Sequence, residues 1–186
     1  MNQPVAVWDG RFQPLHKGHV EVVLSILEQF PSDLALMIID CSTGLRENAE
    51  YESNSHHKVS RNPLSYWERS QMMKSALKEV GCSRRVTVTG MPRPDLHWDL
   101  AKRFYPEHGF ICLTEKDEYE RLKRASWQHL GEETRVIDTS SVSSISSTEV
   151  KRALKRGRGW RQLLPEDVVE YFIEIGGPRR FSHCDL

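Results

Sequence analysis

The sequence predicts an α/β protein with a Rossmann-like, doubly wound parallel sheet of five strands in a single domain. Five apolar runs of strand length recur along the chain, separated by segments with the apolar periodicity of helices. The runs include continuous apolar stretches, which are typical of parallel strands covered on both faces. No internal repeat or shift in composition divides the 186 residues. We therefore expect residues 1–186 to form one domain, with residues 165–186 as a C-terminal helix and tail.

The composition limits the classes of partner. The 26 basic and 26 acidic residues cancel, which argues against a nucleic-acid partner and leaves a local positive site to hold phosphates. No segment reads as a membrane span, and the first residues show neither a basic region nor an apolar signal segment. The four cysteines have no metal-ligand or redox spacing, so we expect reduced thiols in a cytoplasmic protein. They are Cys41, Cys82, Cys112 and Cys184.

Two strands and a helix are expected in the first forty residues. Residues 5–8 form an apolar run and predict the first strand, and residues 34–39 form a second, uninterrupted run. The segment between them predicts a helix, because apolar residues recur at helical spacing. These residues are Val20, Val23, Leu24 and Leu27.

Residues 42–60 are polar and lack apolar periodicity, so we expect a long surface loop. The loop contains His56 and His57. Adjacent histidines lack the i, i+3 or i, i+4 spacing of a helical pair of metal ligands. We therefore do not expect a metal site in this loop.

A helix and a third strand are expected after the loop. Ser65 and Glu68 have the spacing of a capping box, and Gly81 marks the end of the helix. Residues 86–89 predict the third strand, and residues 90–94 a loop at its carboxyl end, where open α/β sheets bind ligands. The apolar residues of the helix are Met72, Met73, Ala76, Leu77 and Val80.

Two more strands are expected at residues 109–113 and 136–138, with a helix between them. Ser146 and Glu149 form a second capping box and begin a further helix. The last helix begins at Pro165 and ends at a pair of glycines. The apolar residues of these three helices are Tyr119, Leu122 and Trp127, then Val150, Ala153 and Leu154, and finally Val168, Val169, Phe172 and Ile175.

The ten-residue turn GRFQPLHKGH joins the first strand to the first helix. Gly10 permits a sharp turn, Pro14 fixes one φ angle, and Gly18 allows another group to approach the start of the helix. The N-terminus of a helix attracts anions, most often phosphates. His16 and His19 are three residues apart, so both rings fall on one side of the helix and can donate hydrogen bonds to one phosphate chain.

The turn has the pattern G-x-F-x-P-x-H-x-G-H, which differs from the three-glycine dinucleotide fingerprint and from the phosphate-binding loop that ends in Gly-Lys-Ser/Thr. It resembles the nucleotidyltransferase superfamily with the H-x-G-H motif. Residues 10–14 look like the nicotinamide mononucleotide (NMN) adenylyltransferase branch of that superfamily, and the C-terminal part of the chain is similar to its archaeal type. The alternative interpretation is a pair of solvated histidines in a loop.

Further segments resemble the same branch in the same chain order. Residues 61–64, Arg-Asn-Pro-Leu, are similar to its Arg/Lys-Asn-Pro-Phe segment, although an Asx-Pro turn before a helix has the same sequence. Trp98 matches loosely a tryptophan that the family places against the nicotinamide ring, and a core position is the alternative. Lys116-Asp117 resembles a pair in bacterial members, with a solvated helix start as the alternative.

The serine-rich segment at residues 143–151 is a second candidate anion site, because hydroxyls and free N–H groups at a helix start can hold phosphates. It resembles the family motif Ile-Ser-x-Thr-x-x-Arg. Lys151 stands at the arginine position, which keeps the charge but loses the planar bidentate geometry, so we expect Arg152 to carry part of that role. A plain N-cap is the alternative interpretation.

The resemblance implies that a phosphate of the acceptor attacks the α-phosphorus of ATP directly, that pyrophosphate leaves, and that Mg²⁺ comes with ATP. The expected catalytic residues are His16 and His19, and the expected acceptor-binding residues are Asn62 and Trp98. No protein ligand to a metal is expected. The expected ATP-binding residues are Gly10, Arg11, Phe12, Gln13, Gly18, Lys116, Asp117, Ser146, Ser147, Thr148, Lys151 and Arg152.

Three hypotheses for the function remain at this level. The first is an adenylyltransferase that joins ATP and NMN into NAD. The second is a related nucleotidyltransferase with another phosphorylated acceptor or with CTP, for which the long 42–60 segment and the loose match at Trp98 leave room. The third is a nucleotide sensor without activity, which the presence of both motif histidines disfavours. The sequence leaves the acceptor and any homo-oligomeric state open.

Overall fold

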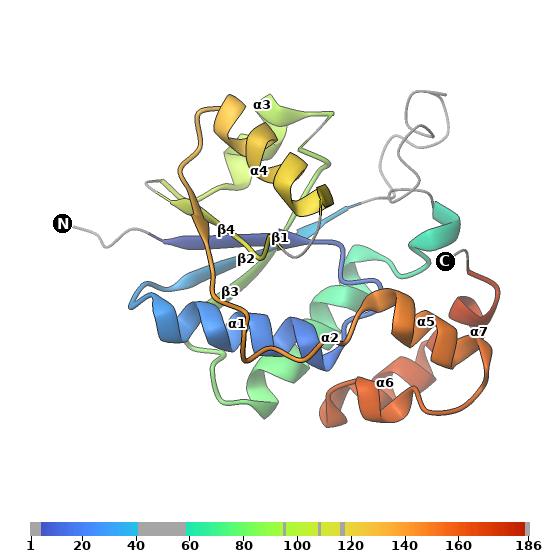
Figure 1. Cartoon of the computed structure of the whole chain (residues 1–186). Coiled ribbons are helices and arrows are strands. Elements are labelled where there is room, and N and C mark those ends of the chain that lie inside the picture. The colour runs from blue at the N-terminus through green and yellow to red at the C-terminus, as the bar shows by residue number, and fades with distance from the viewer. Residues whose placement is uncertain (1–4, 41–58, 95, 108, 116–117, 185–186) are drawn as a thin grey trace.

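Five parallel strands form one sheet in the order β3-β2-β1-β4-β5 in the computed structural model, which describes residues 5–40, 59–94, 96–107, 109–115 and 118–184 (Figure 1). The strands are β1 (Ala6–Gly10), β2 (Leu34–Ile39), β3 (Val86–Met91), β4 (Phe110–Leu113) and β5 (Thr134–Val136). The order reverses between β1 and β4, and ligands of doubly wound sheets bind at the carboxyl ends of the strands beside such a reversal. The predicted fold class is therefore confirmed.

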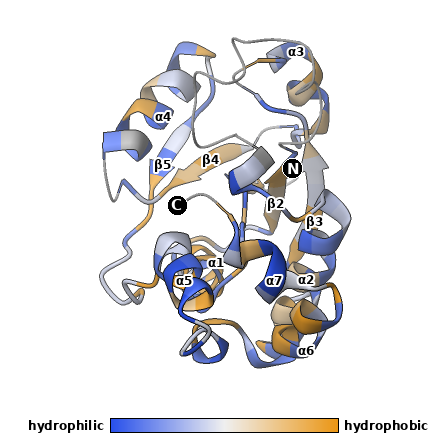
Figure 2. Ribbon diagram, turned by 90° about the vertical axis from the view of Figure 1, so that its right-hand side faces the viewer, coloured by the Kyte–Doolittle hydropathy of each residue, from blue (hydrophilic) through white to orange (hydrophobic). Residues whose placement is uncertain are grey.

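Helices cover both faces of the sheet. Figures 1 and 2 show α3 and α4 on one face and the remaining α-helices on the other. The bounds are α1 (Lys17–Gln29), α2 (Tyr66–Glu79), α3 (Trp98–Ala101), α4 (Glu118–His129), α5 (Ser147–Lys155), α6 (Glu166–Glu174) and α7 (Gly177–Ser182), with 3-10 turns at Val59–Arg61, Lys102–Phe104 and Arg161–Leu163.

Neighbouring residues of the strands supply two separate cores. Along β1, Ala6 and Trp8 belong to the larger core beneath α1, α2 and the C-terminal helices. Val7 points the other way, into a smaller core with Trp127 of α4. Successive side chains of a strand alternate between faces, so all of β2 and the first three residues of β1 are apolar because both faces are covered.

All strands except β2 have bounds that differ from the prediction, because β1 runs from Ala6 to Gly10 and β4 begins one residue late, at Phe110. β5 occupies Thr134–Val136, so the predicted strand at 136–138 begins where the real one ends. It is an edge strand whose Arg135 places its guanidinium 3.8 Å from the centre of the Phe110 ring. A search for apolar runs misses such a strand. β3 continues through Gly90 and Met91, which pair with Ile38 and Ile39, so the loop predicted from residue 90 starts later.

The start of α2 follows the sequence closely. Ser65 and Glu68 form the predicted capping box, with each side chain bonded to the other's backbone N–H. The chain leaves the helix at Gly81, whose φ of +71° is the left-handed conformation favoured there. The loop predicted at 42–60 lies almost wholly outside the described residues, and Val59 and Ser60 belong to a 3-10 turn.

The C-terminal segment is more structured than the predicted helix and tail. α6 ends before Gly176, which has a φ of +69°, and the chain then forms α7. Phe181 and Cys184 are buried against the larger core. Residues 177–182 are therefore a helix of the fold rather than a tail.

The hydrophobicity of the helices and the state of the cysteines can also be stated for the described residues. Their helices offer no apolar stretch that could cross a membrane. Cys82, Cys112 and Cys184 form no disulfides. Burial raises the pKa of Cys112 to about 12, so this thiol is protonated and unreactive at neutral pH.

Candidate active site

The two motif histidines lie at the start of α1, as expected. His16 is the N-cap residue, and the ring centres of His16 and His19 are 3.6 Å apart in a stacked arrangement. The backbone N–H of His16 donates to Nδ1 of His19 over 3.3 Å. An Nδ1 that accepts a hydrogen bond places the proton of neutral His19 on Nε2, which makes Nε2 the donor.

The turn before the histidines is built around Phe12, not Gly10. Phe12 has a φ of +51°, so the left-handed position belongs to a non-glycine residue. A Cβ at Gly10 would lie 2.9 Å from the Phe12 ring, so this glycine provides space rather than a turn conformation. The buried Phe12 ring packs edge-on against Trp8 and His19 and supports the histidine. This corrects the role expected of Gly10.

Gly18 has the expected role of allowing a close approach. A Cβ at this position would lie 2.9 Å from the backbone oxygen of Ile145. Ile145 immediately precedes Ser146, the N-cap of α5. The two predicted anion sites, at the starts of α1 and α5, therefore face each other.

Gln13 joins the turn to the second segment that resembles the family. Its buried side-chain amide donates to the backbone oxygen of Leu64 over 2.7 Å and accepts from the Leu64 N–H over 3.1 Å. These bonds position the turn against residues 62–64. Asn62 is buried in that segment but does not line the pocket as the described residues define it. Its role toward the acceptor stays a prediction.

Arg69 fixes the same region from the inside. It is buried and donates to the backbone oxygens of Arg11 and Ile39, over 2.8 and 2.7 Å. It thereby connects α2 to the turn and to the end of β2. Sequence patterns cannot reveal this role of Arg69, because it depends on two backbone carbonyl groups far away in the chain.

The start of α5 has the expected hydroxyl groups and one cation. Ser146 Oγ accepts from the Glu149 N–H over 3.2 Å, which is one half of the predicted capping box. Lys151 is 5% exposed, and its Nζ donates to the Arg61 backbone oxygen over 2.8 Å. Arg152 is exposed and lies outside the described lining of the pocket. The geometry therefore favours Lys151 over Arg152.

Lys151 belongs to a cationic cluster. Burial lowers the pKa of Lys151, the adjacent Cys184 opposes this shift, and the charges of Arg61 and Arg11 lower the pKa further. The three cations line the same pocket. A cluster of like charges of this kind is suited to an anion that bears several negative charges.

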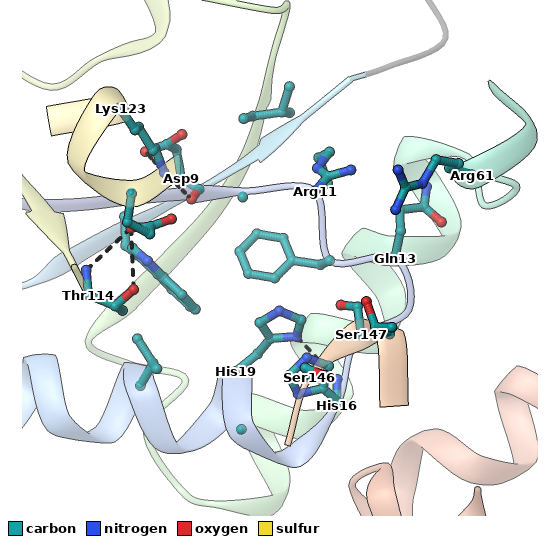
Figure 3. Close-up of a pocket in the computed structure, with 18 of the residues that line it drawn as sticks. Asp9, Arg11, Gln13, His16, His19, Arg61, Thr114, Lys123, Ser146 and Ser147 are labelled. Atoms are coloured by element: carbon teal, nitrogen blue, oxygen red, sulfur yellow. Dashed lines mark hydrogen bonds and ion pairs between the residues drawn. The ribbon is translucent and has the colours of Figure 1, made fainter. Parts of the chain in front are cut away.

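These groups line one pocket of about 690 Å³ at the carboxyl ends of β1 and β4, a size typical of sites for small molecules. Figure 3 shows Arg11, Arg61 and Ser147 at one end, Asp9, Lys123 and Thr114 at the other, and the histidines between. Of the predicted site residues, those that line the pocket are Gly10, Arg11, Phe12, Gln13, His16, Gly18, His19, Ser146, Ser147, Thr148 and Lys151.

The end of the pocket near α4 was not predicted. Asp9 Oδ1 lies 3.0 Å from Lys123 Nζ, and Glu120 accepts from the N–H and hydroxyl of Thr114. The available signal was Asp9 itself, a charge that immediately follows an apolar strand run. No sequence signal pointed to Lys123, because its position in the sequence is typical of a solvated helix face.

The remaining predicted site residues are Lys116, Asp117 and Trp98. Lys116 and Asp117 lie outside the described residues. Trp98 lies at the start of α3, where its ring packs edge-on against Tyr105 and Trp127 at centre distances of 5.7 and 5.2 Å. Trp127 lines the pocket, and Trp98 contacts it from outside that lining. A direct contact between Trp98 and the acceptor stays a prediction.

Comparisons with known proteins agree with this geometry. The sequence model of the family described as Cytidylyltransferase-like matches residues 7–153. A nicotinamide-nucleotide adenylyltransferase of Pyrococcus furiosus is 27% identical over 92% of this chain and 84% of its own length. A phosphonoformate cytidylyltransferase of Streptomyces viridochromogenes is 28% identical over 90% and 89%.

A solved structure from Vibrio parahaemolyticus, described as a nicotinate-nucleotide adenylyltransferase, superimposes with a TM-score of 0.57. It covers 92% of this chain and 99% of its own, at 16% identity. At that identity the likeness supports the fold.

Proposed function

Because the chain belongs to the cytidylyltransferase-like family, we propose that it is the nucleotidyltransferase that transfers AMP from ATP to NMN and forms NAD and pyrophosphate. The observation that carries the proposal is the convergence of the N-termini of α1 and α5 on one pocket, with His16, His19 and Ser146 between them. Two such N-termini can hold one polyphosphate. The archaeal relatives support NMN as the acceptor.

The reaction needs no nucleophile from the protein. A phosphate oxygen of NMN attacks the α-phosphorus of ATP, and the bond to the β-phosphate oxygen breaks as pyrophosphate leaves. Positioning and neutralisation of charge supply the catalysis. His19 Nε2 donates to the phosphate oxygens as their charge grows. Ser147, Thr148 and the free N–H groups of α5 hold the leaving pyrophosphate, with Lys151 and Arg11 as its counter-charges.

Mg²⁺ fits this site as a companion of ATP. No group of three or more His, Cys, Asp or Glu side chains suited to a metal occurs among the described residues. The end of the pocket at Arg11, Arg61 and Ser147, which we call the phosphate end, offers hydroxyl groups and cations instead. Mg²⁺ is commonly bound by substrate phosphates and water with few protein ligands. When bound, it would offset the negative charge of the phosphates, and the chain's own residues would position them.

A second candidate is the transfer of CMP from CTP to a different acceptor. The observation in its favour is the cytidylyltransferase relative, whose identity and coverage match those of the archaeal enzymes. The two candidates share the phosphate end of the pocket and differ in the base and the acceptor.

A matrix of substrates distinguishes them. The full-length protein is incubated with Mg²⁺, either ATP or CTP, and each of NMN, nicotinate mononucleotide, phosphopantetheine, sugar phosphates and phosphonoformate. Released pyrophosphate is measured, and products are identified by mass spectrometry. We expect the highest kcat/KM for ATP with NMN, and NAD as the product. Preference for CTP would establish the second candidate, and absence of pyrophosphate in every combination would exclude both.

A further inference from the structure

Asp9 is a buried carboxylate in the wall of the pocket. Among the described residues, one of its two oxygens has neither an ion-pair partner nor a hydrogen-bond donor. It is the fourth residue of β1 and is 2% exposed. Oδ1 forms the ion pair with Lys123, whose Nζ also donates to the Asp9 backbone oxygen over 3.2 Å. Within the described part of the chain, Oδ2 is buried and accepts no hydrogen bond. Such a group costs stability unless a ligand or water supplies a donor.

Trp127 presents the complementary deficiency in the same pocket. Its indole Nε1 is a buried donor, and no acceptor among the described residues reaches it. Trp127 lies four residues after Lys123 on α4, so the two share one face of the helix. Tyr105 connects the pair, because its ring centre lies 5.5 Å from that of Trp127, and burial first and the charge of Asp9 second raise its pKa. An unsatisfied acceptor and an unsatisfied donor therefore lie in one neighbourhood.

We infer that Asp9 and Trp127 recognise a planar edge of the substrate that carries a hydrogen-bond donor next to an acceptor. The donor N–H bonds to Asp9 Oδ2, and the acceptor bonds to Trp127 Nε1. The inference deepens the proposed function by assigning the residues that select the substrate. Two parts of the substrates carry such an edge, namely the carboxamide of NMN and the amino group and ring nitrogen of adenine.

Asp9 makes the site selective for a neutral edge, and the neighbouring Lys123 limits that selectivity. Lys123 balances the charge of Asp9, so the wall is neutral as a whole. A carboxylate in place of the carboxamide would have no donor for Oδ2 and would face a buried like charge. Sites built to bond a polar group discriminate strongly against analogues that lack it, and the attraction of Lys123 for a carboxylate reduces this effect. We expect the wild-type protein to favour the neutral edge by about 10- to 100-fold.

Asp9→Asn tests the inference, because it replaces one acceptor oxygen of the side chain by an NH₂ donor and keeps the shape of the side chain. Lys123 Nζ stays beside the oxygen of the new amide, so the NH₂ group occupies the place of Oδ2 and becomes a donor. We measure kcat/KM and Kd for NMN against nicotinate mononucleotide, and for ATP against ITP, in which the donor and acceptor of the base edge are exchanged. One of the two preference ratios is expected to fall at least tenfold while the other stays within twofold.

The ratio that changes identifies the source of the edge. A changed NMN to nicotinate ratio assigns the site to the acceptor, and a changed ATP to ITP ratio assigns it to the base. Trp127→Phe, which removes Nε1 and keeps an aromatic ring, is expected to lower the same ratio. If both ratios stay within twofold in a folded Asp9→Asn protein, the inference is wrong.

Three controls keep the result interpretable. Asp9→Asn/Lys123→Gln removes both charges and replaces the single variant if its melting temperature falls. Asp167→Asn, at an exposed carboxylate on α6, should change neither ratio. Tyr105→Phe should also change neither, and a shift equal to that of Asp9→Asn would show that Oδ2 serves the tyrosine and overturn the inference.

The Kd values separate this inference from the proposed function, because binding needs no turnover. A wild-type protein that binds NMN and ATP but releases no pyrophosphate would refute the proposed transfer and leave the Asp9 test valid. A wild-type protein that binds none of the four nucleotides would refute both.

Discussion

At the scale of single residues, the proposed chemistry depends most directly on His19. Its Nδ1 accepts from the His16 N–H, so the turn sets its tautomer and puts the proton of the neutral ring on Nε2. The spacing of the histidines in the sequence predicts that both rings lie on one side of the helix. The stacking of the rings and the support from Phe12 depend on the folded turn.

His19→Ala should lower kcat by about 10²- to 10³-fold and change the KM for ATP little, because a donor aimed at developing charge acts mainly in the transition state. Steady-state kinetics with ATP and NMN check this expectation. His129→Ala, at an exposed histidine on α4, is the matched control and should keep full activity. A loss below tenfold in a folded His19→Ala protein would remove His19 from the catalytic role.

Lys151 should give the activity an alkaline limit. Its pKa lies below the ordinary value, chiefly through burial, so its positive charge is present below that lowered pKa and is lost as pH rises through it. Inhibition by pyrophosphate should therefore weaken at a lower pH than an ordinary lysine would give. Lys151→Arg should move this limit upward, because a guanidinium stays charged.

Two substitutions complete the test of Lys151. Lys151→Ala should weaken pyrophosphate inhibition at neutral pH, whereas Arg152→Ala should not, because Arg152 is exposed outside the described lining. The reverse pattern would transfer the role to Arg152.

At the scale of elements, the C-terminal helices α6 and α7 pack beneath α5, which lines the pocket. Phe181 of α7 is fully buried, its ring centre lies 5.8 Å from that of Phe172, and it lies 5.9 Å below Lys151 Nζ. α7 thus packs against Lys151, the charged residue of α5 that lines the pocket. The sequence predicted α6 but not α7, because a single buried aromatic residue in six positions gives no periodicity.

Phe181→Ala should destabilise the fold by about 3–5 kcal/mol, because it leaves a cavity in the larger core. Chemical denaturation measures this free energy. Ile173→Ala removes an exposed side chain of α6 and should cost far less. Equal effects of the two substitutions would mean that α7 does not pack as described.

At the scale of the whole molecule, the pocket draws on both halves of the sheet. Its walls come from the turn after β1, from α4 after β4, and from the start of α5 after β5. About a hundred residues separate the turn after β1 from the other two segments. A ligand that bridges them should therefore stabilise the molecule as one unit.

Saturation with ATP should raise the melting temperature. A ligand at one hundred times its Kd adds about 2.7 kcal/mol, which corresponds to about 5–11 °C for a domain of this size. Thermal denaturation with increasing ATP checks this expectation. Adenosine, which lacks the phosphates, is the control and should give a much smaller shift. An equal shift with adenosine would mean that the phosphate end contributes little to binding.

The sequence by itself determined the fold class and the two candidate phosphate-binding segments. All of β2 and the first three residues of β1 are apolar because both faces are covered, and the caps at Ser65 and Ser146 depend on residues three positions apart. The turn before α1 is also local, and its residues lie together in the sequence. Interactions of this kind are encoded over a few neighbouring positions, so a pattern can predict them.

Only the tertiary structure decided the remaining features. The pairing of Asp9 with Lys123, the contact of Lys151 with Arg61 and the clamp of Gln13 on Leu64 join positions from 51 to 114 residues apart. The edge strand β5 and the helix α7 are likewise held by contacts from other elements. The physical reason is that a buried polar group takes whichever partner the packing brings to it, and no spacing along the chain records that partner.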